Sequence, residues 1–155
     1  MEVTLEAFQK RYQYKSPTDL IGRGGFSDVY KAWDTQDEQF VAIKIASATP
    51  GEKYTLESEV KKIKKLKHPN LIEYYESYEV STGTKDIHGN TLNYQVAVME
   101  YADGGTLADL LKTRALTIPE VEDLAAGIIN GLAYLHANNI SRRDLKPANR
   151  AGKYL

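Results

Sequence analysis

Hydrophobic residues between positions 20 and 45 come in short runs, broken by three glycines and by a polar stretch at 34–38. Short β-branched and aromatic runs with such breaks are typical of antiparallel strands joined by hairpins. Two later runs have the same character, and the polar segment between them suits a long turn over 81–93. The pattern therefore predicts five strands, over 17–22, 27–33, 39–46, 71–79 and 94–100.

Helical spacing appears in three other segments. Between residues 54 and 67 hydrophobic residues recur three and four positions apart, which predicts an amphipathic helix. Thr106 is placed to cap a short helix ending near residue 111, and Thr117 with Glu120 forms a capping box for a longer helix reaching residue 136. We expect an α+β fold, in which a curled five-stranded antiparallel sheet with one helix precedes two further helices.

Composition narrows the function classes. The chain has 155 residues, a length that favours a single domain or a small domain with an appended helical piece. Twenty basic and 21 acidic residues give a net charge of −1, which offers no general attraction for nucleic acid or an anionic membrane. There is no cysteine, no apolar leader in the first ten residues, and no run of apolar residues long enough for a membrane span. We expect a cytoplasmic protein with neither nucleic-acid nor membrane partners.

The stretch from Ile21 to Val29 contains Gly22, Gly24 and Gly25. Glycines let a backbone approach phosphate oxygens and offer its N–H groups without side-chain obstruction. A dinucleotide-binding loop would lead into a helix, and a P-loop would carry Gly-Lys-Ser or Gly-Lys-Thr. Here a strand follows and no such sequence is present, so the predicted arrangement is strand–loop–strand, and the loop alone is a weak signal of function.

A lysine interrupts the next strand. The sequence Val41-Ala42-Ile43-Lys44 is apolar except for Lys44, which is either an ordinary edge residue or a functional cation. The helix that follows offers two carboxylates as partners, Glu57 and Glu59.

Near the C-terminus the chain reads Arg143-Asp144-Leu145-Lys146-Pro147-Ala148-Asn149. With the glycine loop and Lys44, in this order and spacing, this motif resembles the protein kinase family, and its Asp-Leu-Lys-Pro wording resembles serine/threonine kinases. The resemblance covers about residues 15–150. It implies three parts: an N-terminal extension (1–14), an N-lobe with hinge (15–103), and part of a C-lobe with two helices and the catalytic loop (104–155).

The resemblance also implies catalytic roles. Glu59, nine residues before His68-Pro69-Asn70, is the expected partner that holds Lys44 toward the α- and β-phosphates of ATP. Asp144 would accept the proton of the substrate hydroxyl, Lys146 would contact the γ-phosphate, and Asn149 would bind magnesium. The implied activity is transfer of the ATP γ-phosphate to Ser or Thr hydroxyls of a protein substrate.

The same resemblance implies a nucleotide site. Met99 stands at the gatekeeper position, and the hinge residues Glu100 and Ala102 would hydrogen-bond adenine through their backbones. The remaining predicted nucleotide-binding residues lie in the glycine loop and the two strands after it, and Ser27 takes the third glycine position: Ile21, Gly22, Gly24, Ser27, Val29 and Ala42.

The sequence departs from the family at its end. No Asp-Phe-Gly follows Asn149 before the chain ends at Leu155, so we expect a truncated domain that binds ATP and magnesium weakly and turns over negligibly. A pseudokinase-like nucleotide-binding module and a scaffold or interaction fragment are the alternatives. Arg142 replaces the family's histidine, and Arg150 stands where apolar packing is usual. Unpartnered arginines in a core would be costly, which suggests an engineered, resurfaced truncation, with a natural degenerate pseudokinase as the rival hypothesis.

The helix expected over 118–136 is apolar on more than one face. An apolar stripe of this size either folds back on the chain, pairs with a second copy, or stays exposed. We expect a symmetric homodimer, because a two-fold axis lets one patch cover both copies. The stripe consists of Val121, Leu124, Ile128, Leu132 and Leu135.

Overall fold

The computed structural model describes residues 1–25, 27–47 and 55–140. These residues group into two compact units, one formed by 1–65 with 73–101 and the other by 66–72 with the residues from 102 onward. The elements, in chain order, are β1 (Glu2–Thr4), α1 (Leu5–Arg11), β2 (Tyr12–Gln13), β3 (Leu20–Arg23), β4 (Ser27–Asp34), β5 (Gln39–Ser47), α2 (Leu56–Ile63), β6 (Tyr74–Lys85), β7 (Thr91–Glu100), α3 (Leu107–Thr113) and α4 (Ile118–Ala137).

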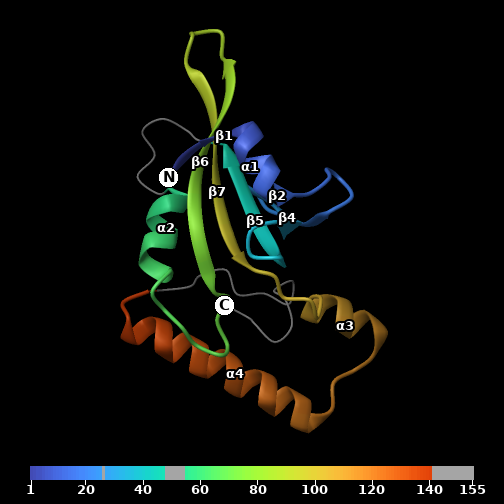
Figure 1. The fold of residues 1–155 in the computed structure, drawn as a ribbon. Coiled ribbons are helices and arrows are strands. Elements are labelled where there is room, and N and C mark those ends of the chain that lie inside the picture. Colours follow the sequence, from blue (N-terminus) through green and yellow to red (C-terminus); the bar gives the residue numbers. More distant parts are fainter. Residues whose placement is uncertain (26, 48–54, 141–155) are drawn as a thin grey trace. The chain divides into compact units, whose positions relative to one another are not determined.

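The first unit contains a seven-stranded sheet with the order β1-β6-β7-β5-β4-β2, and β3 pairs with β4 (Figure 1). The five predicted strands are β3 to β7, and every pairing among them is antiparallel, which confirms the expected α+β fold. The N-terminal extension enlarges this sheet. Its strand β1 runs parallel to β6, while β2 pairs antiparallel with β4.

The predicted long turn over 81–93 is wrong, because most of this segment is a β-hairpin. Strands β6 and β7 continue into it until Lys85 pairs with Thr91, and the hairpin extends beyond the rest of the sheet (Figure 1). Asp86 closes the turn by accepting hydrogen bonds from the backbone N–H groups of His88 and Asn90. Strand pairing uses backbone groups, so a hairpin can form where both faces carry polar side chains. Such a hairpin has no alternation of hydrophobic residues by which it could be predicted.

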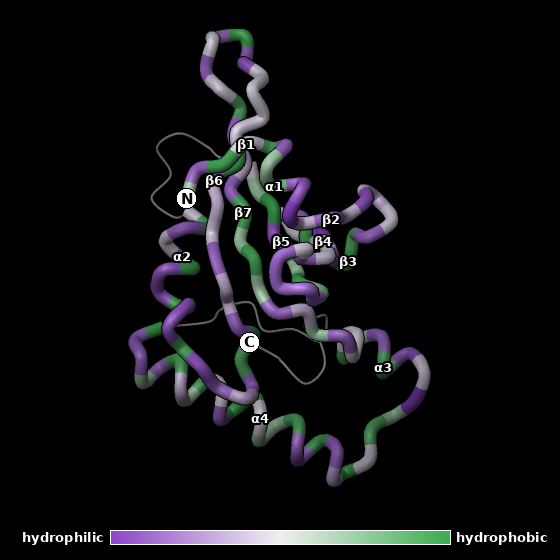
Figure 2. Tube along the Cα trace, in the orientation of Figure 1, coloured by the Kyte–Doolittle hydropathy of each residue, from purple (hydrophilic) through white to green (hydrophobic). Residues whose placement is uncertain are grey.

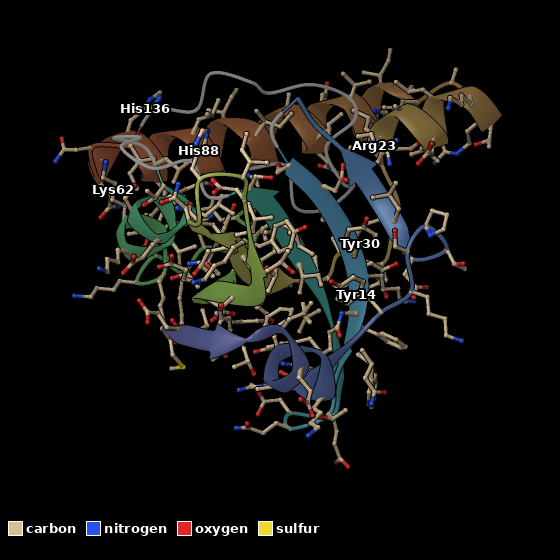
Figure 3. The ribbon with its side chains drawn as sticks, turned by 90° about the horizontal axis from the view of Figure 1, so that it is seen from above. Tyr14, Arg23, Tyr30, Lys62, His88 and His136 are labelled. Carbon is tan, nitrogen blue, oxygen red and sulfur yellow. The ribbon has the colours of Figure 1, made fainter. Side chains whose placement is uncertain are left out.

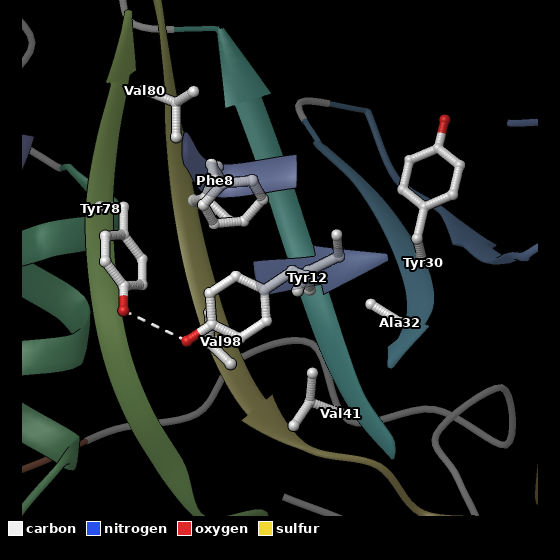
Figure 4. Close-up of a cluster of buried hydrophobic side chains, with 10 residues drawn as sticks. Phe8, Tyr12, Tyr30, Ala32, Val41, Tyr78, Val80 and Val98 are labelled. Carbon is white, nitrogen blue, oxygen red and sulfur yellow. Dashed lines mark hydrogen bonds between the residues drawn. The ribbon is translucent and has the colours of Figure 1, made fainter. Parts of the chain in front are cut away.

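One face of the sheet, here called the outer face, holds the main core. Along β5 the odd-numbered residues Val41 and Ile43 point to this face and are fully buried. The extension covers them, because Phe8 from α1 and Tyr12 from β2 pack into the same cluster (Figure 4). The Tyr12 hydroxyl also shares a 3.1 Å hydrogen bond with that of Tyr78, so this buried phenol is not left without a partner.

An ion pair fixes the extension to the sheet. The Arg11 guanidinium donates two hydrogen bonds to the buried carboxylate of Asp34, at 3.1 and 3.0 Å, and one more to Asp37. Burial by itself raises the pKa of Asp34, but the hydrogen bonds from Arg11 and from two backbone N–H groups outweigh it and leave the pKa below its usual value of 3.8. Asp34 therefore stays ionised and paired at neutral pH.

Helix α2 lies against the opposite face of the sheet. Thr55 and Ser58 form its capping box, and the backbone N–H of Leu56 donates to the Gln95 side chain on β7 at 2.8 Å. The helix is mostly hydrophilic, and its buried residues are Leu56 and Val60 (Figure 2). It ends at Ile63, earlier than predicted, and Lys64 just beyond pairs with Glu76 of β6 at 2.7 Å.

The second unit contains α3 and α4, and both begin with a capping box. The predicted box of Thr117 and Glu120 is present. Arg114 donates to both oxygens of Glu120 and, with Thr117, holds the pKa of that carboxyl at about 2. Hydrophobic and hydrophilic residues alternate along α4 (Figure 2), and Leu135 packs with Leu71 in a small core. Within the described residues no helix is both long enough and apolar enough to cross a bilayer.

Replacing Arg11 by Ala should lower the free energy of unfolding by about 2 kcal/mol, because Asp34 would remain buried without its partner. The measurement is urea denaturation at neutral pH. Lys10→Ala is the matched control, since Lys10 pairs with Glu6 on an exposed surface and its loss should cost less than about 0.5 kcal/mol. Equal effects of the two substitutions would contradict the structural role of the Arg11–Asp34 pair.

Candidate functional site

The glycine loop joins β3 and β4. The backbone N–H of Gly24 donates to the carbonyl of Ser27 at 2.8 Å, which closes the turn. A Cβ atom added at Gly24 would lie 3.2 Å from that same carbonyl oxygen, whereas one added at Gly25 would meet nothing within 4 Å. Of the predicted loop residues, Ile21 and Gly22 lie in β3 and Ser27 begins β4. The backbone therefore turns tightly at Gly24 and is open at Gly25.

Strand register brings the predicted pocket residues onto one face, here called the inner face. Val29 of β4 and Lys44 of β5 are directly opposite each other, and in the next row Ala42 is opposite Met99 of β7. Residues opposite each other in an antiparallel pair share a face. The side chains of Val29, Ala42, Lys44 and Met99 thus lie together, on the side of the sheet away from the main core.

Helix α2 brings a carboxylate to this lysine. Glu59 Oε1 lies 3.7 Å from Lys44 Nζ, whereas Glu57 forms a 2.7 Å pair with Lys61 of its own helix. The distances thus decide between the two candidate carboxylates, and Glu59 is the partner of Lys44. The Glu59 side chain is 38% exposed and the Lys44 side chain 27% exposed, so a bound ligand could reach the pair.

Two side chains on the inner face, Tyr74 and Lys31, were not identified from the sequence. The Tyr74 hydroxyl donates to Glu59 Oε1 at 3.3 Å, and Tyr74 is opposite Met99 on the inner face. Lys31, opposite Ala42, has its ammonium 4.1 Å from the ring centre of Phe40 and 4.8 Å from that of Tyr101. In the sequence, Tyr74 stands out only as an aromatic residue near the start of a predicted strand. Its contact with Glu59 could not be predicted, because it depends on how the helix packs on the sheet.

The predicted hinge begins where β7 ends. The backbone N–H of Glu100 donates to the Glu73 carbonyl at 2.8 Å, and the Glu100 side chain accepts from the Glu73 backbone at 3.1 Å. Any contact of Glu100 with adenine therefore falls to its carbonyl oxygen. Ala102 is buried and belongs to the second unit.

The predicted catalytic-loop residues Asp144, Lys146 and Asn149 lie outside the described residues, as do Arg142 and Arg150. Across residues 1–25, 27–47 and 55–140, no three histidine, aspartate or glutamate side chains gather as metal ligands would. The expected magnesium ligand, Asn149, is one of the residues that the structure does not describe.

A hollow of about 500 Å³ lies behind the site, on the outer face. Its walls include Phe8 of α1 and the rings of Tyr14 and Tyr30, whose centres are 5.0 Å apart (Figure 3). Gly24, Gly25 and Ser27 also line it, together with Ile45 and Val96, which belong to the outer-face core. The hollow thus shares Gly24 and Ser27 with the predicted nucleotide site, whereas Lys44, Ala42 and Met99 are not among its lining residues.

Comparison with known proteins identifies the class. The protein kinase domain model matches residues 16–150, so the chain belongs to the protein kinase family. Among solved structures, Rad53 1–466 in complex with AMP-PNP superposes with a TM-score of 0.72 and 28% identity, over 92% of this chain and 34% of that one.

Two sequence relatives are serine/threonine kinases. Serine/threonine-protein kinase 1 of Arabidopsis thaliana is 30% identical over 95% of this chain, which spans 16% of that protein. The probable serine/threonine-protein kinase PknB of Bifidobacterium longum is 34% identical over 84% of this chain, which spans 19% of that protein. The chain thus covers less than a fifth of the length of either relative.

Gly24→Ala should destabilise the first unit by about 1 kcal/mol relative to Gly25→Ala, since its new methyl group meets the Ser27 carbonyl while the methyl at residue 25 meets open space. Urea denaturation gives the free energies, and amide chemical shifts report the displacement at Ser27. Indistinguishable stabilities and shifts in the two variants would contradict the tight turn.

Proposed function

We propose that this chain is the ATP-binding part of a serine/threonine protein kinase. The observation that carries the proposal is the Lys44–Glu59 pair, 3.7 Å apart on the inner face that also holds Val29, Ala42 and Met99. A cation held by a carboxylate beside a small apolar surface suits a ligand with an aromatic base and an anionic chain. The serine/threonine kinases among the relatives support the same class.

In this proposal each group has one task. The open backbone of the glycine loop offers N–H donors to the phosphates, and Lys44 neutralises charge on the α- and β-phosphates. Val29 and Ala42 cover the adenine ring, while Glu100 and Ala102 hydrogen-bond its edge. The division into an N-lobe with hinge over 15–103 and a partial C-lobe over 104–155 remains part of the proposal.

The chemical step would use the catalytic-loop residues. Asp144 takes the proton of the Ser or Thr hydroxyl as that oxygen attacks the γ-phosphorus, and the bond from the γ-phosphorus to the ADP oxygen breaks. Lys146 holds the γ-phosphate. Magnesium, when bound, neutralises phosphate charge, and Asn149 is the proposed protein ligand. A single uncharged amide is a weak holder for this ion, so magnesium would bind mainly through the nucleotide.

A polypeptide of these 155 residues contains no Asp-Phe-Gly sequence, and that motif supplies the principal metal-binding aspartate in the family. We therefore propose that this polypeptide binds ATP without measurable phosphoryl transfer. The competing function is that of a non-catalytic, pseudokinase-like nucleotide-binding or scaffold module. Cytoplasmic location and the absence of nucleic-acid and membrane partners remain predictions.

Calorimetric titration with ATP tests the binding. We expect weak affinity that changes little when magnesium is omitted, and a further loss of about tenfold in Lys44→Ala because a charge contact to phosphate is removed. Lys61→Ala is the control, since Lys61 pairs with Glu57 away from Lys44 and should leave the affinity unchanged. Nanomolar, strongly magnesium-dependent affinity would refute the proposal of an incomplete site.

Radiolabel transfer from ATP to a generic Ser/Thr substrate tests the chemistry and separates the two functions. The 155-residue polypeptide should transfer nothing measurable, and Asp144→Asn should leave that result unchanged. Transfer that Asp144→Asn abolishes would overturn the proposed inactivity. If a longer polypeptide that includes this segment binds ATP but transfers nothing either, the scaffold function is favoured.

We also propose that helix α4 mediates a symmetric homodimer. Three apolar side chains of this helix are largely exposed: Ile118 (75%), Val121 (49%) and Ile129 (63%). Exposed apolar surface is unfavourable in water, and a two-fold axis would let one patch cover the other. Size exclusion with light scattering at micromolar concentration should give twice the monomer mass, and Ile129→Glu should give the monomer. A monodisperse monomer that Ile129→Glu does not alter would rule the dimer out.

A further inference from the structure

Tyr74 contacts the one carboxylate on which the proposed site depends. Its hydroxyl donates to Glu59 Oε1 at 3.3 Å, and Lys44 Nζ approaches the same oxygen atom at 3.7 Å. The three side chains come from three elements, β6, α2 and β5. The tyrosine hydrogen bond is the shorter of these two contacts to Oε1.

The two contacts constrain Glu59 differently. An ion pair between partly exposed side chains tolerates a wide range of geometry, because its energy varies slowly with distance and water competes for both charges. A hydroxyl donor is directional, and a tyrosine has few rotatable bonds. The position of the Tyr74 hydroxyl is therefore set by the sheet, where Tyr74 is opposite Met99.

The contacts between α2 and the sheet fix the helix backbone but not the side-chain rotamer of Glu59. The helix is tied to the sheet near its two ends, by the hydrogen bond from Leu56 to Gln95 and by the pair of Lys64 with Glu76. Glu59 lies between these ties, with a side chain that is 38% exposed. Fixing the backbone of a short helix does not fix the rotamer of a long carboxylate side chain, which retains several torsional states.

We propose that Tyr74 is a positioning residue, whose hydroxyl holds Glu59 in the rotamer that directs Lys44 to the phosphates of a bound nucleotide. The role rests on the proposed ATP-binding function and adds a third side chain to its charged pair. Tyr74 acts through Glu59 and makes no contact with the nucleotide in this role. Its effect is accordingly confined to ligands that carry phosphates.

Tyr74→Phe removes the hydroxyl and keeps the ring. Calorimetry should give a three- to tenfold loss of affinity for ATP and ADP and no change for adenosine, which has no phosphate for Lys44 to reach. Tyr75→Phe is the matched control, because Tyr75 is the next residue and packs against the outer-face core, on the other side of the sheet. It should change none of the three affinities. An equal loss for adenosine, or an unchanged ATP affinity in Tyr74→Phe, would refute the positioning role.

A double-substitution cycle tests the contact without nucleotide. Tyr74→Phe should lower the urea midpoint in the parent chain but not in a Glu59→Ala background, since the acceptor is then already absent. Equal shifts in the two backgrounds would refute the hydrogen bond. If the parent chain binds no ATP, the proposed function fails and the positioning role with it, even where the cycle shows the coupling. If ATP binds and Tyr74→Phe has no effect, only the positioning role fails.

Discussion

The alternation of side chains along β5 is the constraint on which the rest of this structure depends. Val41 and Ile43 point to the outer face and are fully buried, while Ala42 and Lys44 between them point to the inner face. One strand therefore carries both the centre of the core and the cation of the proposed site. A shift of one residue in its register would bury Lys44 in the core and expose the valine and isoleucine, so packing of the core also fixes the site.

The N-terminal extension covers the outer face of the sheet. Without a cover, the apolar side chains on that face would be exposed to water, and Phe8 and Tyr12 pack over them. The Arg11–Asp34 pair holds the cover in place at the edge of β4. The family model begins at residue 16, so the elements that cover the outer face precede the matched segment. The strand that bears Lys44 thus has its outer face covered in part by residues that precede the matched segment.

Sequence reasoning located the elements whose side chains alternate or recur with a clear period, which is why β4, β5 and α4 were found within a residue or two. It missed β1 and β2, because strands of three and two residues have no period and exist only through partners far along the chain. The family resemblance and the spacing before His68-Pro69-Asn70 predicted the contact between Lys44 and Glu59, whose 3.7 Å distance agrees with it. Sequence reasoning missed Tyr74, because a hydroxyl that meets a carboxylate 15 residues away follows from the packing of α2 on β6.

Two ion pairs of the first unit, Arg11–Asp34 and Lys44–Glu59, differ in distance and exposure. Arg11 meets Asp34 through two hydrogen bonds of about 3 Å, with a carboxylate that is only 3% exposed, and such a pair resists exchange of partners. Lys44 meets Glu59 at 3.7 Å with both side chains partly exposed. Partly exposed pairs contribute little to stability, on the order of 0–1 kcal/mol, so folding alone gives weak reason to place a lysine in this apolar strand. The proposed contact of Lys44 with phosphate offers a stronger reason, because it needs a partner that orients the lysine without saturating its three donors, and Glu59, which also accepts a hydrogen bond from Tyr74, suits that proposal.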